Sequence, residues 1–301
     1  MRDNMVSVVV PSYNYEKYIE ECLESIASQE YKLIELIIVD DFSKDNSVDV
    51  IKAFIDKYRQ KKRFYDIKFL RHNQNQGAHY TINEGIQAAT GKYIAVINAD
   101  DLYEKNRFAV MISEMIRGNK QIAFSNIEVI DNKSDLAQGE EAENFRAIQK
   151  RIDECGEVWK ALMIQNVAIS TGNMIFTKEL YKQLKGFREY KYIHDWDFIL
   201  RATLIEEPLY VQGTKYLYRL HETNSFRELG NIANQEVEQV LTHFFKEIKK
   251  SRVINMNLKK ENVYNSIDNT YLSIYWKKEG IIRRLMKRII THKKERCNMI
   301  E

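Results

Sequence analysis

Short apolar runs alternate with amphipathic helical patterns through the first half of the chain, and this alternation constrains the fold more than any other feature. The runs have the length of buried strands and lie at residues 6–10, 34–39, 67–70, 93–97 and 121–127. Between them, apolar residues recur at helical spacing over 15–28, 48–58, 78–89 and 105–117. Strand–helix alternation of this kind predicts an α/β fold with a mostly parallel sheet that helices cover on both faces.

The second half is less regular. Segment 131–150 is polar and has no convincing period, so we expect a mobile loop there. Helical patterns resume at 158–164, 178–184 and 195–205, and a strand-like run covers 209–220. From about residue 230 the pattern is helical and charged, which predicts a helical, basic extension over 226–301 behind a domain that covers 1–225.

Composition excludes several classes of protein. The net charge of +3 is too balanced to indicate nucleic-acid binding. Cys22, Cys155 and Cys297 are odd in number and lack metal-ligand spacing, so we expect reduced thiols in a cytoplasmic protein. The amino terminus does not resemble a signal peptide, and no apolar stretch approaches the length of a transmembrane helix.

Polar clusters follow four of the predicted strands. They are Pro11-Ser12-Tyr13-Asn14, residues 40–47, residues 73–77, and Asn98-Ala99-Asp100-Asp101. The carboxyl ends of parallel strands meet at one edge of the sheet, which is where such sheets bind ligands. Two adjacent acids such as Asp100 and Asp101 repel each other unless a cation or several donors hold them. Each cluster alone also fits a turn or a helix cap, and only their coincidence indicates a ligand site.

Each cluster has a chemistry of its own. Backbone groups and the Tyr13 ring suit a planar base, and a carboxylate after the second strand can accept hydrogen bonds from a base or a ribose. Gly77 allows close backbone approach at a helix start, where amides can face a phosphate.

In order and spacing, residues 8–14, 38–43, 75–77 and 91–101 resemble the family 2 glycosyltransferases, and the resemblance spans roughly residues 5–225. It implies a GT-A fold, in which a Rossmann-like, nucleotide-sugar-binding half (1–101) joins an acceptor-binding half (102–225). The implied activity is inverting transfer of a sugar from a nucleotide-diphosphate sugar to a hydroxyl of a saccharide or lipid-linked acceptor. Uridine is the commonest base in the family, and the implied setting is bacterial surface polysaccharide synthesis.

The resemblance also implies roles for individual residues. His194-Asp195-Trp196-Asp197 is similar to the acidic motif that carries the catalytic base, which makes Asp195 the group that takes the proton of the acceptor hydroxyl. Asn173 is a candidate acceptor contact, and Asp41 is expected to recognise the base. The implied nucleotide-sugar-binding residues are Pro11, Ser12, Tyr13, Asp41, Asn75, Gly77, Asn98 and Asp100, and the implied ligands of Mn²⁺ or Mg²⁺ are Asp101, Asp100 and His221.

Three positions depart from the family pattern. Asn98 stands where the first acid is usual, His194 where an acid commonly precedes the base, and Ile82 where many relatives have Arg. A basic contact to the diphosphate would then come from Arg71 or His79. These departures leave open the alternative that the chain is a non-catalytic relative that binds a nucleotide-sugar without transferring the sugar. A nucleotidyltransferase is a further alternative, but the glycine-rich, basic loop that such enzymes need is absent near the first strand.

The carboxyl-terminal segment 277–296 contains nine Lys or Arg and two Glu, with an apolar stripe at helical spacing. One interpretation is a helix that lies on an anionic membrane surface, which would place the protein at the inner face of the plasma membrane. The other is a helix whose stripe packs on the GT-A core. The sequence leaves both open.

Overall fold

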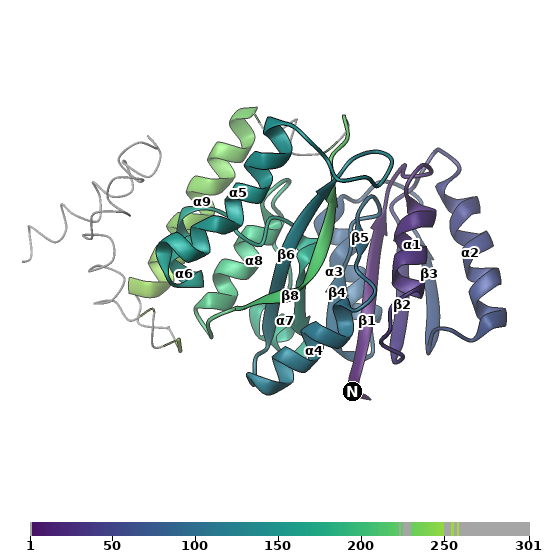
Figure 1. Cartoon of the computed structure of the whole chain (residues 1–301), viewed down its shortest axis with the longest axis horizontal. Coiled ribbons are helices and arrows are strands. Elements are labelled where there is room, and N and C mark those ends of the chain that lie inside the picture. Colours follow the sequence, from purple (N-terminus) through teal and green to yellow (C-terminus); the bar gives the residue numbers. More distant parts are fainter. Residues whose placement is uncertain (1, 223, 225–229, 250–253, 256–257, 259–301) are drawn as a thin grey trace, which may run out of the picture.

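The computed structural model describes residues 2–222, 224, 230–249, 254–255 and 258. Within these residues a central sheet is covered by helices on both faces (Figure 1), so the predicted α/β architecture is confirmed. The predicted basic helix at 277–296 lies outside the described residues, as does most of the predicted extension.

The eight-stranded sheet has the order β3-β2-β1-β4-β7-β6-β8-β5. Its first four strands in this order are parallel, β7 runs antiparallel to both of its neighbours, and β6 and β8 are parallel. The sheet is therefore mixed in its second half. The strands are β1 (Arg2–Ser12), β2 (Ile34–Asp40), β3 (Asp66–Arg71), β4 (Gly91–Val96), β5 (Leu102–Tyr103), β6 (Ile122–Ile130), β7 (Met174–Thr177) and β8 (Leu209–Arg219).

Helices α1, α2 and α4 pack on one face of the sheet, and α3, α7 and α8 pack on the other. The helices within the described residues are α1 (Ile19–Ala27), α2 (Ser47–Lys61), α3 (Ala78–Ala88), α4 (Arg107–Arg117), α5 (Glu140–Cys155), α6 (Val158–Ile164), α7 (Lys178–Leu184), α8 (His194–Thr203) and α9 (Gly230–Lys249), with a short 3₁₀ turn η1 (Thr171–Asn173).

Side chains of the central strands alternate between two cores. Val8 and Val10 of β1 point to the core under α1 and α2, whereas Val9 points to the core under α3. Both faces are apolar, which is why these strands appear in the sequence as continuous apolar runs. Helix α3 approaches β1 closely at Gly85, where an added Cβ would lie 2.4 Å from a methyl carbon of Val9.

One prediction about the fold is wrong. Much of the expected loop 131–150 is helix α5. That helix is rich in charged residues and buries little apart from Ala142, Gln149 and Ile152, so the polarity of the segment hides its helical spacing. Its Arg146 donates to Glu128, which attaches the charged helix to β6, and to the Ala137 carbonyl in the segment between them. The short strands β5 and β7 were not predicted either, because two and four residues are too few to show alternation.

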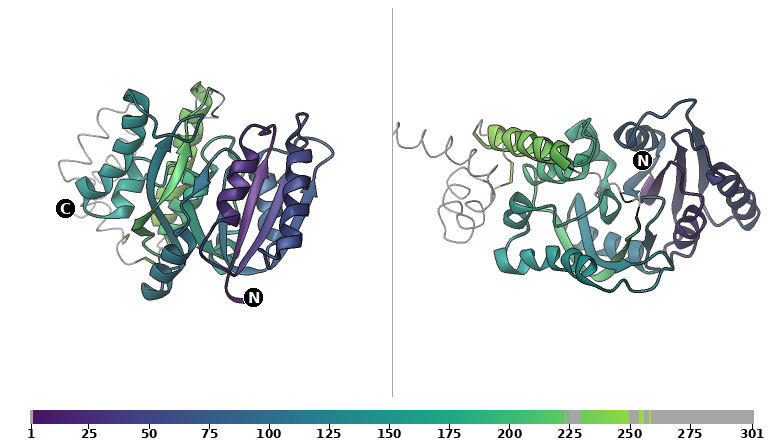
Figure 2. Two further views of the ribbon diagram at one scale, coloured as in Figure 1. Left: turned by 45° about the vertical axis from the view of Figure 1, so that its right-hand side comes forward. Right: turned by 90° about the horizontal axis from the view of Figure 1, so that it is seen from above.

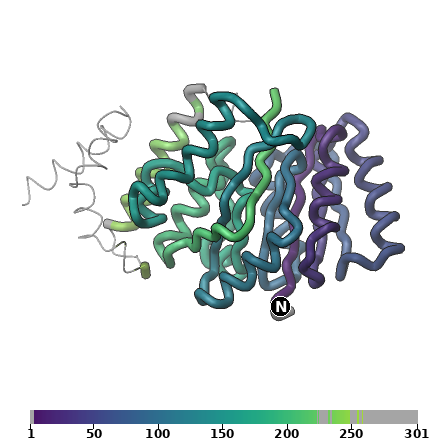
Figure 3. The backbone as a smooth tube through the Cα atoms, in the orientation of Figure 1, coloured from purple at the N-terminus to yellow at the C-terminus, as the bar shows by residue number. Residues whose placement is uncertain are grey.

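The backbone places the earlier residues on one side of the molecule and the later ones on the other (Figure 3). Seen from above, helix α9 lies at the opposite end of the molecule from α2 (Figure 2, right). No helix among the described residues is long and apolar enough to cross a bilayer.

Candidate active site

The predicted clusters meet at the carboxyl edge of the sheet. The Asp41 amide donates to the Ser12 carbonyl at 2.8 Å, and the Ile97 amide donates to the Val9 carbonyl at 3.0 Å, so the ends of β1, β2 and β4 are held side by side. The end of β8 joins them through Arg219, whose amide donates to Asp101 at 2.8 Å. Residues from the two halves of the chain therefore share one edge.

Asp100 and His221 form a buried pair at this edge. Nε2 of His221 lies 2.8 Å from Oδ2 of Asp100, although 121 residues separate them in the chain. The other oxygen of Asp100, Oδ1, is buried and has no hydrogen-bond partner in the part of the chain that the structure describes. Two ligands at right angles around Mg²⁺, each about 2.1 Å from the ion, are about 3 Å apart, so this pair fits adjacent positions on a hard divalent cation.

Asp101 lies deeper and is already occupied by the protein. Its Oδ1 accepts the Arg219 amide, and its Oδ2 accepts the Tyr216 hydroxyl and, at 3.0 Å, the side chain of Asn98. Burial and, after it, the charge of Asp100 raise the pKa of Asp101. The geometry therefore favours Asp100 over Asp101 as a metal ligand and gives Asp101 a structural role that links β4 to β8.

Aromatic rings enclose His221. The ring of Tyr18 stacks on it with centroids 5.1 Å apart, and the ring of Tyr15 meets it edge-on at 6.4 Å. Burial and the neighbouring charges of Asp100 and Asp101 raise the pKa of Tyr15, so its hydroxyl stays protonated and able to donate beside these acids. The histidine therefore has little freedom to leave Asp100.

Asp195 lies in the first turn of α8 and is 9% exposed. Its Oδ1 accepts the Trp196 amide at 2.7 Å, and its Oδ2 accepts the Asn166 side chain at 2.9 Å. Burial raises the pKa of Asp195 to about 7, and these two donors only partly oppose the shift. A carboxylate with this pKa can both accept and release a proton near neutral pH.

Tyr218 connects this acid to the other two. Burial, followed by the charges of Asp101, Asp100 and Asp195, raises the pKa of its hydroxyl, so all three carboxylates act on one tyrosine of β8. By contrast, burial and, to a smaller extent, His79 lower the pKa of His194 to about 4. His194 is thus neutral at the pH where Asp195 titrates.

Asp41 holds the loop that precedes α3. Its carboxylate accepts the amides of Gln76 at 2.7 Å and Gly77 at 2.8 Å, and Nδ1 of His72 lies 2.6 Å from its Oδ1. Asn75 also reaches the Asp41 carbonyl, at 3.4 Å. Since a carboxylate offers about four acceptor positions, one on Oδ2 stays available for a ligand.

The remaining predicted nucleotide residues lie around the ends of β1 and β4. Pro11 and Ser12 end β1, and Tyr13 follows with 43% of its surface exposed, as a stacking ring requires. The buried Ser12 Oγ has no hydrogen-bond partner among the described residues. Asn98 donates to Asp101 and to Ser170, both at 3.0 Å, so its amide is tied to the protein.

Asn173 is not available to an acceptor, and that expectation is wrong. It is fully buried, and both ends of its amide bond to Ser125, with further bonds to Arg107 and to the Ala168 carbonyl. Ile82 packs in the core, so the position where relatives carry Arg offers nothing to a ligand.

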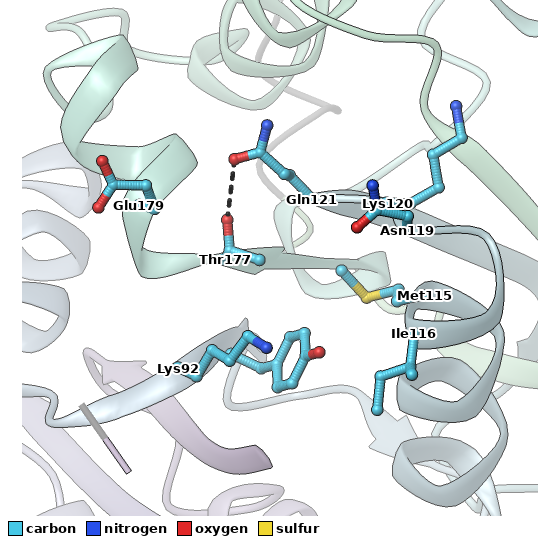
Figure 4. A pocket seen from close by; sticks show the side chains of 9 residues that line it. Lys92, Met115, Ile116, Asn119, Lys120, Gln121, Thr177 and Glu179 are labelled. Atoms are coloured by element: carbon cyan, nitrogen blue, oxygen red, sulfur yellow. Dashed lines mark hydrogen bonds between the residues drawn. The ribbon is translucent and has the colours of Figure 1, made fainter. Parts of the chain in front are cut away.

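A separate open pocket lies away from this edge, between the start of β4 and the ends of α4 and β7 (Figure 4). It measures about 430 Å³, and its lining includes Lys92, Ile116, Lys120, Thr177 and Glu179. Lys92 lies near the start of β4 and Asp100 follows the end of that strand, so this pocket is remote from the acidic cluster.

Sequence reasoning missed several residues of the site. Asn166 and Tyr216 contact the predicted acids but stand at no strand end, whereas Arg219 ends β8 and contacts Asp101 through its backbone amide. His72 is adjacent to a predicted cluster, and its position at the end of β3 was the one available signal.

Comparison with known proteins identifies the family of the chain. The sequence model of "Glycosyl transferase family 2" matches residues 7–185. The chain is 26% identical over 207 residues to the Escherichia coli UDP-Glc:alpha-D-GlcNAc-diphosphoundecaprenol beta-1,3-glucosyltransferase WfgD. The aligned residues cover 69% of this chain and 72% of WfgD.

Two solved structures share the fold. Staphylococcus aureus TarS 1–349 in complex with UDP-GlcNAc superposes with a TM-score of 0.63 at 19% identity, covering 91% of this chain and 76% of TarS. The mannosyltransferase PcManGT from Pyrobaculum calidifontis, in complex with GDP-Man and Mn²⁺, superposes with a TM-score of 0.60 at 16% identity. The match covers 80% of this chain and 64% of PcManGT. Because the family model spans more than half of the chain, the protein belongs to glycosyl transferase family 2, and the predicted GT-A fold and transferase class are confirmed.

Proposed function

We propose that the chain transfers a sugar, with inversion, from a UDP-sugar to a hydroxyl of a saccharide or lipid-linked acceptor. One observation carries the proposal: a buried acid on α8 with a pKa near 7 and a separate acid–histidine pair both contribute to the raised pKa of the same tyrosine, Tyr218 of β8. Inverting transfer needs both parts, a base for the incoming hydroxyl and a cationic site for the leaving diphosphate.

In this mechanism Asp195 removes the proton of the acceptor hydroxyl, and the freed oxygen attacks the anomeric carbon from the side opposite the diphosphate. The carbon–oxygen bond to the diphosphate breaks, and its electron pair stays on the nucleotide. Asp195 keeps the proton on a carboxylate oxygen, where burial favours the neutral form. One carboxylate that acts from one side gives inversion in one displacement.

Asp100 and His221 would hold Mn²⁺ or Mg²⁺, which neutralises the charge that develops on the leaving diphosphate. Within the described ranges, no three His, Cys, Asp or Glu side chains are arranged to bind a metal by themselves. The ion would therefore depend on the diphosphate for further ligands, as Mg²⁺ sites commonly do.

The nucleotide would lie over residues 1–101, with its base against Tyr13 and the open position of Asp41, and the acceptor over 102–225. The relatives bind different bases, since WfgD is named for UDP-Glc and PcManGT was solved with GDP-Man. The name of WfgD, with its diphosphoundecaprenol acceptor, supports a lipid-linked acceptor and surface polysaccharide synthesis for this chain too.

The test is a panel of UDP-Glc, UDP-GlcNAc, UDP-Gal and GDP-Man with Mn²⁺. We expect one UDP-sugar to raise the melting temperature and to release UDP slowly, with water as the acceptor. Stabilisation without any release, together with no transfer to added saccharides or lipid-linked sugars, would favour the non-catalytic relative. No stabilisation by any donor would refute the proposal.

A further inference from the structure

Asn166 contacts the proposed base directly. It lies in the turn after α6, and its side-chain nitrogen donates to Oδ2 of Asp195 at 2.9 Å. A carboxylate can only accept, so the amide must present its NH₂ group to Asp195. Its orientation is thereby fixed by chemistry.

The other end of the same amide has no role in the fold. Oδ1 of Asn166 is buried and has no hydrogen-bond partner among the residues that the structure describes. Asn173 offers a contrast, since both ends of its amide are bonded to neighbouring groups. A buried amide oxygen without a donor costs free energy, and an asparagine kept only for stability would satisfy both ends.

We propose that Asn166 is a positioning residue, which holds the Asp195 carboxylate ionised and correctly oriented for proton removal. The inference rests on the proposed role of Asp195 as the base. The Trp196 amide fixes one carboxylate oxygen and Asn166 fixes the other, so the plane of the carboxylate is defined by two donors. The Trp196 donor is a backbone amide, which a substitution leaves in place, whereas the Asn166 donor is a side chain that a substitution can remove.

The surroundings of Asp195 make this donor important. The charge of Asp195 contributes to the raised pKa of Tyr218 on β8, and its own helix contributes His194 and Asp197. Asp197 is paired with Arg201 and Arg188, whereas no ion pair is found for Asp195 within the described residues. With burial opposing ionisation, neutral hydrogen bonds are the means by which this carboxylate is kept charged.

The test measures the titration of Asp195 itself. Carboxyl ¹³C shifts of aspartate-labelled protein are followed against pH, and the resonance that disappears in Asp195→Asn identifies the residue. We expect a midpoint near 7 in the wild type. In Asn166→Ala it should rise by about one pH unit, which makes the ionised form about tenfold rarer below the midpoint.

Two further variants complete the design. Asn166→Asp keeps the shape but adds a like charge, so its Asp195 midpoint should rise at least as far, and it serves if the alanine variant fails to fold. Gln165→Ala is the matched control, because the neighbouring Gln165 accepts from Arg151 instead, and its midpoint should not move. An unchanged Asp195 midpoint in a folded Asn166 variant would overturn the inference. Sugar-nucleotide turnover that survives in Asp195→Asn would instead refute the proposed base.

Discussion

Replacing Asp195 by Asn should stabilise the protein, and increasingly so as the pH rises. In the folded state burial raises the pKa of Asp195 from 3.8 to about 7. The folded protein therefore binds a proton that the unfolded chain releases between these values. Stability that is present below pH 4 is lost as the pH rises through about 7. The neutral asparagine removes this loss.

The magnitude follows from the two pKa values. With one pKa unit equal to 1.36 kcal/mol, the ionisation of Asp195 costs the wild type about 1.5 kcal/mol at pH 5 and about 4 kcal/mol at pH 8. The variant also loses a hydrogen bond, because a neutral amide cannot accept from both Trp196 and Asn166, at a cost of about 1 kcal/mol at either pH. The cost of the lost hydrogen bond is the same at pH 5 and pH 8 and cancels when the two are compared. The difference in unfolding free energy between variant and wild type therefore changes by about 2–3 kcal/mol.

Urea unfolding of both proteins at pH 5 and pH 8 measures this change. We expect the variant's stability relative to the wild type to increase by about 2–3 kcal/mol between the two pH values. Asp197→Asn is unsuitable as a control because it breaks an ion pair, whereas the exposed Asp56→Asn alters only a surface charge. A stability difference that is the same at pH 5 and pH 8 would show that Asp195 is not a buried acid with a raised pKa.

Other predictions concern the rest of the site. His72→Gln should weaken UDP binding measured by calorimetry. Burial lowers the pKa of His72, but its two carboxylate partners outweigh burial and raise it, so the ring loses its charge and the wild-type affinity for UDP falls above pH 6.5. Affinities that are equal in the two proteins and independent of pH would refute this. Asp100→Asn should abolish the effect of Mn²⁺ on UDP binding without a large loss of stability. Asp101→Ala should instead destabilise the fold by about 3 kcal/mol. A destabilised Asp100 variant and a stable Asp101 variant that no longer responds to Mn²⁺ would exchange their roles. Gly172→Ala should lower the melting temperature by several degrees, because the new Cβ would lie 1.9 Å from the Tyr216 hydroxyl, and an unchanged value would contradict that packing.

The fold was predictable where the chain forms regular, buried elements. The strands at 6–10, 34–39 and 93–97 appear as apolar runs because both faces of each strand are covered. The family resemblance named Asp100 and His221 as candidate metal ligands, and the structure places them side by side. Helix α5 was missed because its charged residues outnumber the few that it buries, so the segment reads as polar.

The supporting contacts of the site were beyond the sequence for a different reason. Tyr216 reaches Asp101 across 115 residues, and Asn166 reaches Asp195 across 29, so no local pattern links the partners. The same holds for the different roles that we propose for Asp100 and Asp101. Both are acids after one strand, and only the positions of their neighbours decide which of them is open to a ligand.

The most direct test of the proposed function compares wild type and Asp195→Asn at pH 8 with Mn²⁺ and the UDP-sugar that the wild type uses best. UDP release and UDP affinity are measured on the same preparations. The account predicts that release falls by at least about 100-fold while the affinity for UDP changes by less than about twofold. Release at the wild-type rate in the variant would contradict it.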